Sequence, residues 1–320
     1  MDLPKITLDA LNESGHKYRK DFVRIPVIAL QESTKFMTIR PGVRYKETFF
    51  APDFKAELQK YEVAERQKVK GDFKPRTLET QFLACFFDFD PNAVIRSLLG
   101  HQASQAGDGA KNTPSAREVV ASVLKNVGAS LNLNLFKAKQ EEEGNTTATS
   151  FDGFDTIVDA EIAAGNISEE KGNLVKLTDK IDNTNAVEVI KKALYKANSS
   201  LRKEENFIYC STAIADAYND NYLITHTGLV YNDKYEQPYL EGSNKKATFA
   251  PLEGKDGSKY IFITQKNNMI VGVDQMSDQE RVEFNKYQPK DITGELYMFF
   301  GTQFESIDPA RLLVIQLPSE

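Results

Sequence analysis

The feature that most constrains this fold is a long charged segment near the start of the chain. Residues 36–80 open with strand-like alternation on either side of a turn at Pro41 and Gly42. From Arg40 to Arg76 the segment carries 10 basic and 6 acidic residues, with too few apolar ones to build a core. We therefore expect it to project into solvent or to rest on another chain.

The distribution of charge supports contact between subunits. The 320 residues hold 40 basic and 46 acidic side chains, a net charge of −6, which argues against a general nucleic-acid binder. Residues 1–80 have 16 basic against 12 acidic residues, which leaves 24 against 34 for the rest. Opposite fields of this kind favour and orient association between one part of a subunit and another part of its neighbour.

The chain reads as a soluble protein made in the cytoplasm. Its hydrophobic content of 41% is ordinary for a globular protein, and no apolar run approaches the roughly 18 residues of a membrane helix. The first residues show no secretion signal. Cys85 and Cys210 lie far apart in the sequence, which indicates buried thiols in a reducing compartment and no disulfide framework.

A long helix is the clearest predicted element. Thr113 and Pro114 match an N-cap followed by proline at the first helical position. Apolar residues then recur at spacings of three and four, at Val120, Leu124, Val127, Leu131, Leu135 and Ala138. This pattern predicts a helix over residues 114–140, about 27 residues and roughly 40 Å long. Glu141, Glu142 and Glu143 at its end oppose the helix dipole and indicate a solvated end or a contact with basic residues of another subunit.

The second half of the chain predicts an α+β fold. Helices are expected at 153–164 and 186–197, and another begins after Ser211 and Thr212. Strands are expected at 207–210, 260–263, 269–273, 296–300 and 312–315. A helix is also expected to begin at Pro91, after the N-cap Asp90, and a helical turn at 277–280. These elements lack the regular spacing of a doubly wound sheet.

Few residues in the sequence point to catalytic chemistry. His16, His101 and His226 have no partner at metal-ligand spacing, so we expect no metal site. Cys210 has only His226 nearby in sequence as a base, and a packed thiol is the favoured interpretation.

Other motifs are equally weak. The loop Gly107-Asp108-Gly109 lacks the strand that precedes a dinucleotide fingerprint, and the pair Asp88 and Asp90 is best explained by helix capping. We expect a structural protein with no cofactor and no enzymatic activity. The 46 acidic residues nevertheless leave open a catalytic site built from carboxylates.

Three blocks of sequence resemble one known family. They are residues 151–157 (FDGFDTI), residues 207–211 (FIYCS) followed by Ala217 and Tyr218, and residues 267–274 (NNMIVGVD) followed by 296–303. Together with the order of the predicted parts, they resemble the major capsid proteins of tailed bacteriophages and prophages, which have the Hong Kong 97-type fold. The resemblance covers nearly the whole chain.

The resemblance implies a set of segments and a function. The segments are an N-terminal arm at 1–35, an extended E-loop at 36–80, a peripheral (P) domain at 81–150 with its spine helix at 114–140, an axial (A) domain at 151–277, P-domain strands at 278–306 and a final A-domain strand at 307–320. The implied function is self-assembly as pentamers and hexamers into an icosahedral shell that encloses phage double-stranded DNA. The implied partners are other copies of the chain, with portal, scaffold or cement proteins, and without a membrane; the implied location is the virion, after assembly in the bacterial cytoplasm.

The predicted intersubunit contacts lie on the basic surplus of the E-loop. The residues are Arg44, Lys46, Arg66, Lys68, Lys70 and Lys74. Some family members crosslink an E-loop lysine to an asparagine, but no local motif selects such residues here. Two alternatives remain: an encapsulin-like compartment that holds protein cargo, and a cytoplasmic α+β hydrolase with a carboxylate site, which would be a compact particle with a deep pocket.

Overall fold

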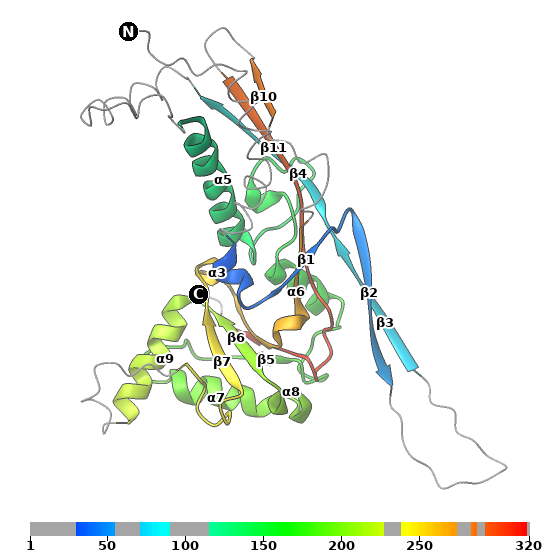
Figure 1. Ribbon diagram of the computed structural model, residues 1–320. Helices are drawn as coiled ribbons and strands as arrows, with labels where there is room; N and C mark the ends of the chain where they lie inside the picture. Colours follow the sequence, from blue (N-terminus) through cyan, green and yellow to red (C-terminus); the bar gives the residue numbers. More distant parts are fainter. Residues whose placement is uncertain are drawn as a thin grey trace, which may run out of the picture.

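The computed structural model describes residues 30–54, 71–89, 115–226, 238–273, 283–286 and 292–318. Figure 1 shows a lower body built on one sheet, a second sheet and the helix α5 (Ser115–Asn134) above it, and a two-stranded ribbon that projects away from both. The mixture of helices and strands confirms the α+β class that the sequence predicts.

The lower sheet has the strand order β5-β12-β8-β6-β7. Its strands are β5 (Leu174–Lys176), β6 (Asn206–Cys210), β7 (Ala247–Pro251), β8 (Tyr260–Thr264) and β12 (Leu312–Gln316). The helices of this part are α6 (Phe154–Ala163), α7 (Ala186–Lys196), α8 (Ser199–Lys203) and α9 (Thr212–Thr225). Ser211 is the N-cap of α9, and its side chain accepts a hydrogen bond from the Ile214 amide, as the sequence predicts.

Both faces of the lower sheet are buried, so its strands read as continuous apolar runs. In β8, Ile261 and Ile263 pack into a cluster that includes residues of α7 and α9. Phe262, between them, points to the opposite face and packs with Phe136 and Phe154. This alternation follows from the two-residue period of a strand and places a helical layer on each side.

The upper sheet runs β1-β9-β11-β10, with β4 paired to the other edge of β11. Its strands are β1 (Thr38–Pro41), β4 (Gln81–Phe89), β9 (Met269–Val273), β10 (Glu283–Lys286) and β11 (Ile292–Phe304). The strand predicted at 296–300 is therefore part of a 13-residue strand. β9, which the predicted axial segment 151–277 includes, pairs instead with β1 and β11 in this upper sheet.

The ribbon is formed by β2 (Lys46–Phe54) and β3 (Gly71–Glu79), which are antiparallel over nine residue pairs. It projects from the body, as its charge predicts (Figure 1). At its base, Phe49 and Leu78 pack with Val43 and with Ile270 of β9. The ribbon is therefore anchored to the body at this end.

The long helix is shorter than predicted. α5 ends at Asn134, whereas the apolar pattern extends the prediction to residue 140. Beyond it, the carbonyls of Leu135, Phe136 and Ala138 accept hydrogen bonds from the amides of residues 153–155 at the start of α6. Leu135 and Ala138 are buried, but on a turn and not on the helix. Glu141, Glu142 and Glu143 are consequently exposed in a loop and do not lie at a helix end.

Short elements complete the described part of the chain. They are α3 (Gln31–Thr34), η2 (Thr147–Thr149), η4 (Glu253–Lys255) and η5 (Lys266–Asn268). In α3, Ser33 donates a hydrogen bond to the side chain of Asn132 in α5. The helix predicted at Pro91, the loop around Gly107 and the turn at 277–280 lie outside the described residues.

Candidate interaction surfaces

In the described part of the chain, the histidine, cysteine and aspartate side chains considered in the sequence form no cluster of three or more. Within the described ranges, no group of three or more His, Cys, Asp or Glu side chains could hold a metal ion, and no helix is long and apolar enough to cross a membrane. His226 follows α9 and stacks on Tyr222 at 4.2 Å between ring centroids. His16 and His101 lie outside the described residues.

The two thiols differ in burial. Cys210 is fully buried in the sheet core, and this burial raises its pKa to about 12. Its thiol therefore stays protonated and packs as an apolar group, as predicted. Cys85 is half-buried, and burial raises its pKa as well.

The interpretation of Asp88 as a helix cap is wrong. Asp88 lies within β4, opposite Thr293 of β11, and is exposed. The run of phenylalanines around it belongs to a strand, because the alternation of exposed and half-buried residues along β4 follows a period of two. Asp90, the other member of the pair, lies outside the described residues.

A buried lysine forms a highly connected polar cluster in the described part of the lower body. Lys255 is fully buried and donates to Asp155 Oδ1 at 2.7 Å, to the Tyr260 carbonyl at 2.9 Å and to Ser258 Oγ at 3.1 Å. Its Nζ also lies 3.5 Å from the centroid of the Phe262 ring. Because all three ammonium protons have acceptors, the cluster ties α6 to the loop after β7 and offers no free group to a ligand.

The predicted contact residues of the ribbon are only partly described. Lys46 is exposed and pairs with Glu79 of its own chain, with 2.7 Å between Nζ and Oε1. Arg44 is exposed at the base of the ribbon, and Lys74 lies in β3. Arg66, Lys68 and Lys70 lie outside the described residues. Of the six predicted residues, the structure thus describes the side chains of Arg44 and Lys46, which are two positions apart in the sequence, and their role as intersubunit contacts stays a prediction.

Arg76 fixes the ribbon to the body, a role that the sequence did not indicate. Its guanidinium donates to Glu161 Oε1 of α6 at 2.7 Å, to Gln303 Oε1 at 2.8 Å and to the Phe304 carbonyl at 3.1 Å. Gln303 in turn donates to the Thr77 carbonyl of β3 at 2.9 Å. These bonds join β3, β11 and α6 at one point, so they set the direction in which the ribbon leaves the body.

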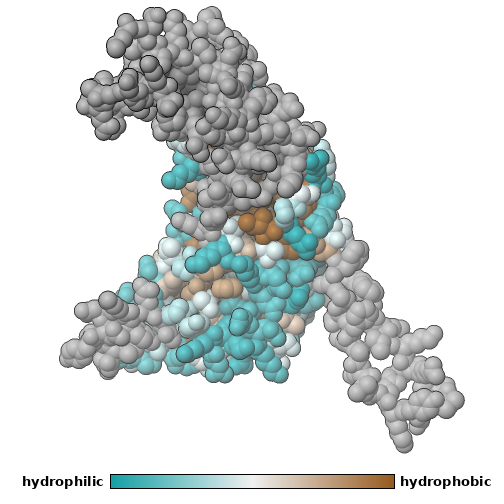
Figure 2. Space-filling view, in the orientation of Figure 1, coloured by the Kyte–Doolittle hydropathy of each residue, from teal (hydrophilic) through white to brown (hydrophobic). Residues whose placement is uncertain are grey.

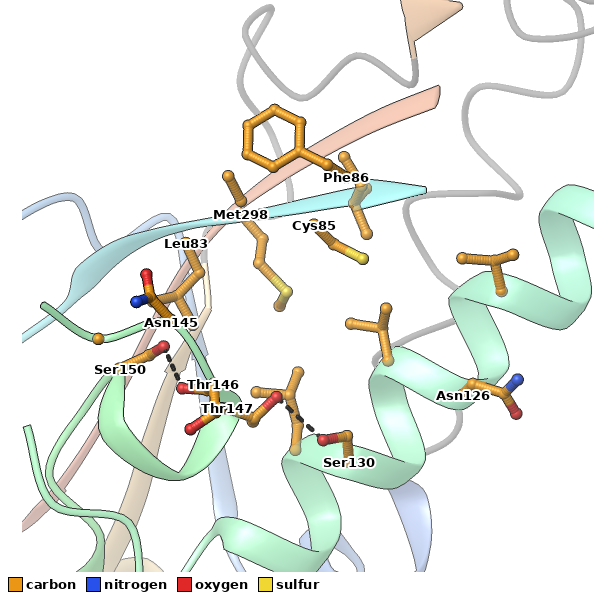
Figure 3. Close-up of a pocket in the computed structure, with 16 residues that line it drawn as sticks. Leu83, Cys85, Phe86, Asn126, Ser130, Asn145, Thr146, Thr147, Ser150 and Met298 are labelled. Atoms are coloured by element: carbon orange, nitrogen blue, oxygen red, sulfur yellow. Dashed lines mark hydrogen bonds between the residues drawn. The ribbon is translucent and has the colours of Figure 1, made fainter. Parts of the chain in front are cut away.

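A groove lies between α5 and the β4/β11 pair, with a volume of about 660 Å³. Figure 3 shows the side chains of Cys85 and Met298 on the groove side of the sheet, whereas the ring of Phe86 lies on the other side of β4. One end of the groove is polar: Ser130 donates to Thr147 at 2.9 Å, and Ser150 donates to the Thr146 carbonyl at 2.6 Å. In the orientation of Figure 1, Figure 2 shows a small apolar patch above a largely hydrophilic lower body.

The opposite side of the β4/β11 pair carries a continuous row of aromatic rings, called here the aromatic stripe. Its members are Tyr45, Phe299, Phe82, Tyr297 and Phe86, in that order, with successive ring centroids 5.2, 4.9, 5.5 and 6.3 Å apart. Three members are strongly exposed: Tyr45 at 67%, Phe86 at 64% and Phe82 at 51%. The alternation of exposed and half-buried residues along β4 places Phe82 and Phe86 on one face of the strand. The pairing register with β11 was needed to show that the rings of both strands form one surface.

This chain resembles known proteins in its three-dimensional structure and not in its sequence. No protein-family model matches the sequence, and no curated protein matches it in sequence. Among solved structures, a chain of the satellite phage P4 procapsid is 12% identical, with a TM-score of 0.54 over 92% of this chain and 98% of that chain.

Two further structures give the same result. A chain of the cyanophage A-1(L) capsid is 13% identical, with a TM-score of 0.53 over 92% of both chains. A chain of the capsid of an empty GTA particle is 10% identical, with a TM-score of 0.53 over 91% of this chain and 90% of that chain. At these identities the likeness is one of fold. The resemblance that the sequence predicts is therefore confirmed at the level of the fold: this chain folds as bacteriophage capsid proteins do.

Proposed function

We propose that this chain is the major capsid protein of a phage or prophage, which assembles as pentamers and hexamers into an icosahedral shell around double-stranded DNA. The observation that carries the proposal is the extent of the fold match. About nine-tenths of this chain superimposes on at least nine-tenths of capsid chains from P4, cyanophage A-1(L) and GTA particles. A shared core alone would leave the ribbon and the upper sheet unmatched.

The projecting ribbon supports the same function. A two-stranded sheet is marginally stable in water by itself, and the anchoring contacts described for this one lie at its base. A subunit that lies against identical neighbours gives such a ribbon a surface to rest on. In Hong Kong 97-type terms, we assign the ribbon to the E-loop, α5 to the spine helix, the upper sheet to the P domain and the lower sheet to the A domain.

Charge complementarity suggests how the ribbon meets its neighbour. The ribbon segment has a basic surplus, with Arg44, Lys46, Arg66, Lys68, Lys70 and Lys74 as the proposed contact residues. The body is acidic, and Glu141, Glu142 and Glu143 form an exposed acidic run close to the start of β4, where Gln140 accepts a hydrogen bond from Gln81. We assign this run as one docking position for a neighbouring ribbon.

The first test is the quaternary structure of the chain expressed alone. Size-exclusion chromatography and negative-stain electron microscopy are expected to show rings of five or six subunits, or closed shells. A compact monomer at every salt and protein concentration would contradict the proposal. Shells that enclose protein cargo in place of DNA in the native host would instead favour a compartment of the encapsulin type.

The second test addresses the charges of the ribbon. Reversal of Arg44, Arg66, Lys68 and Lys70 to glutamate should slow assembly strongly at low salt, because like charges then face each other. The matched control reverses the same number of cations, Lys171, Lys176, Lys196 and Lys203, which are exposed on the lower body. Light scattering at several salt concentrations measures the rate. Equal rates for the two variants would contradict a steering role for the ribbon.

A further inference from the structure

The base of the ribbon rests on one face of the upper sheet. Two pairs of residues opposite each other in β9 and β11 form this face: Gly272 with Gly301, and Ile270 with Gln303. Because side chains alternate along a strand, these four residues share a face, called here the seat. We propose that the seat fixes the angle of the ribbon to the body and thereby the angle between neighbouring subunits and the diameter of the shell. This inference rests on the proposed function, in which the ribbon lies on a neighbouring copy.

The two glycines of the seat allow the end of β3 to lie very close to the sheet. A Cβ atom added to Gly301 would lie 2.2 Å from the carbonyl oxygen of Glu79, and one added to Gly272 would lie 2.7 Å from Cδ2 of Leu78. Both distances are far inside the separation at which nonbonded atoms attract each other. Any other residue at either position must therefore push the end of β3 away from the sheet, so the glycines set the height of the ribbon.

The polar member of the seat holds the ribbon at a second place. Gln303 accepts a hydrogen bond from Arg76 at 2.8 Å and donates one to the Thr77 carbonyl at 2.9 Å. Arg76 extends the attachment to α6, where it donates to Glu161 Oε1 at 2.7 Å. Arg76 lies three residues before Glu79 in β3. Contact at one place would leave a pivot, whereas contacts at two places along β3 fix the direction of the strand.

The length of the ribbon amplifies small changes at the seat. Between Leu78 and Gly71, β3 extends over seven residues, roughly 24 Å at about 3.4 Å per residue. A tilt of about 10° at the seat therefore moves the far end of β3 by roughly 4 Å, close to the spacing of about 4.8 Å between paired strands. A neighbour that binds this ribbon must shift or rotate by a similar amount to keep its contacts. The angle between subunits, and with it the curvature of the shell, consequently depends on the seat.

Spin labels measure the angle of the ribbon in unassembled subunits. One nitroxide is placed at Asp53→Cys, in the pair next to the far end of the ribbon, and the other at Lys171→Cys, which is exposed on the lower body. A Cys85→Ala background removes the half-buried thiol, and Cys210 stays unlabelled because it is fully buried. Pulsed electron paramagnetic resonance then gives the distribution of distances between the two labels. The parent protein should show one narrow distribution.

Two seat variants should change this distribution. Gly301→Ala crowds the end of β3, and Gln303→Met removes the hydrogen bonds to Arg76 and Thr77 without adding bulk. Each should shift or broaden the distance by about 4 Å or more. The matched control is Gly294→Ala on the same strand, where the added Cβ meets the ring of Phe87 and not the ribbon. A broad distribution in the parent, or seat variants that match the control, would overturn the inference.

The diameter of assembled particles tests the consequence for the shell. Electron microscopy should show at least five-fold fewer particles of the parental diameter for the two seat variants, with other diameters or open sheets in their place. Lys255→Met, which destabilises the lower body away from the seat, should lower the yield and keep the diameter, so a change of diameter reports the angle and not stability. Seat variants with the parental diameter and yield would overturn the inference and leave the shell function standing. If the unmodified chain forms no oligomer, the shell function fails and the link to diameter fails with it.

Discussion

Two cations on the ribbon make a matched pair for measuring what holds it to the body. Arg76 and Lys46 each lie 2.7 Å from a glutamate oxygen. The side chains of the first pair, Arg76 and Glu161, are 12% and 19% exposed, whereas those of Lys46 and its partner are 65% and 51% exposed. Arg76→Met and Lys46→Met remove the same charge from the same ribbon, so a difference in their effects reports burial.

The expected magnitudes follow from the partners. Arg76→Met removes charged hydrogen bonds to Glu161 and Gln303 and a further one to the Phe304 carbonyl, and breaking a fully buried pair costs about 3–5 kcal/mol. Because Glu161 keeps a hydrogen bond from Asn166 at 2.7 Å and retains some solvent, we expect a loss of about 2–4 kcal/mol. Lys46→Met should cost about 0.5 kcal/mol or less.

The assay is urea unfolding of unassembled subunits. The chain has no tryptophan, so far-ultraviolet circular dichroism and tyrosine fluorescence are the suitable signals. Arg76→Met should lower the unfolding midpoint clearly, and Lys46→Met should leave it nearly unchanged. Equal shifts for the two variants would show that Arg76 does not anchor the ribbon. A Glu161→Gln variant closes a double-mutant cycle and isolates the pairwise energy.

Three further predictions concern the core. Burial lowers the pKa of the Lys255 ammonium group to about 8, from an ordinary value of 10.5. The unfolded chain therefore binds the ammonium proton more tightly than the folded chain does. As a result, the contribution of Lys255 to the free energy of unfolding rises between pH 8 and about 10.5. Urea unfolding should show wild type gaining stability relative to Lys255→Met over this range, and a pH-independent difference would contradict the reasoning. Cys85 should react with a thiol reagent before Cys210, because Cys210 is fully buried and its pKa is raised to about 12. Timed labelling at pH 8, read by peptide mass spectrometry, measures the order, and faster labelling of Cys210 would refute the prediction. Gly301→Ala places a Cβ 2.2 Å from a backbone oxygen of β3, so it should destabilise the protein by about 1–3 kcal/mol. Thermal unfolding measures this loss, and an unchanged melting temperature would contradict the prediction.

Much of the secondary structure follows from local signals. The helices α6, α7 and α9 and the strands β6, β8, β9 and β12 lie where the sequence predicts them, because capping residues and apolar periodicity act over a few neighbouring positions. The end of α5, in contrast, was not predicted correctly by these local signals. Its apolar pattern continues to Ala138, but amides from the start of α6 take the carbonyls that would extend the helix.

The candidate surfaces were less accessible to sequence reasoning. The basic surplus of the ribbon is visible as composition, so Arg44 and Lys46 could be named in advance. Arg76 looks no different from its basic neighbours, and its role depends on Glu161 and Gln303, which are 85 and 227 positions away. Likewise, Lys255 reads as a loop residue until Asp155 and Phe262 surround it.

By itself, the sequence determines where most helices and strands form, and it determines that residues 36–80 hold too few apolar residues to build a core of their own. Both depend on residue type and spacing along the chain. Only the tertiary structure decides which strands pair, and thus that the rings of β4 and β11 join into one exposed stripe while the opposite faces line a groove. The physical reason is that pairing register and hydrogen bonding are settled between residues far apart in sequence, where the free energy of burial on both partners selects one arrangement.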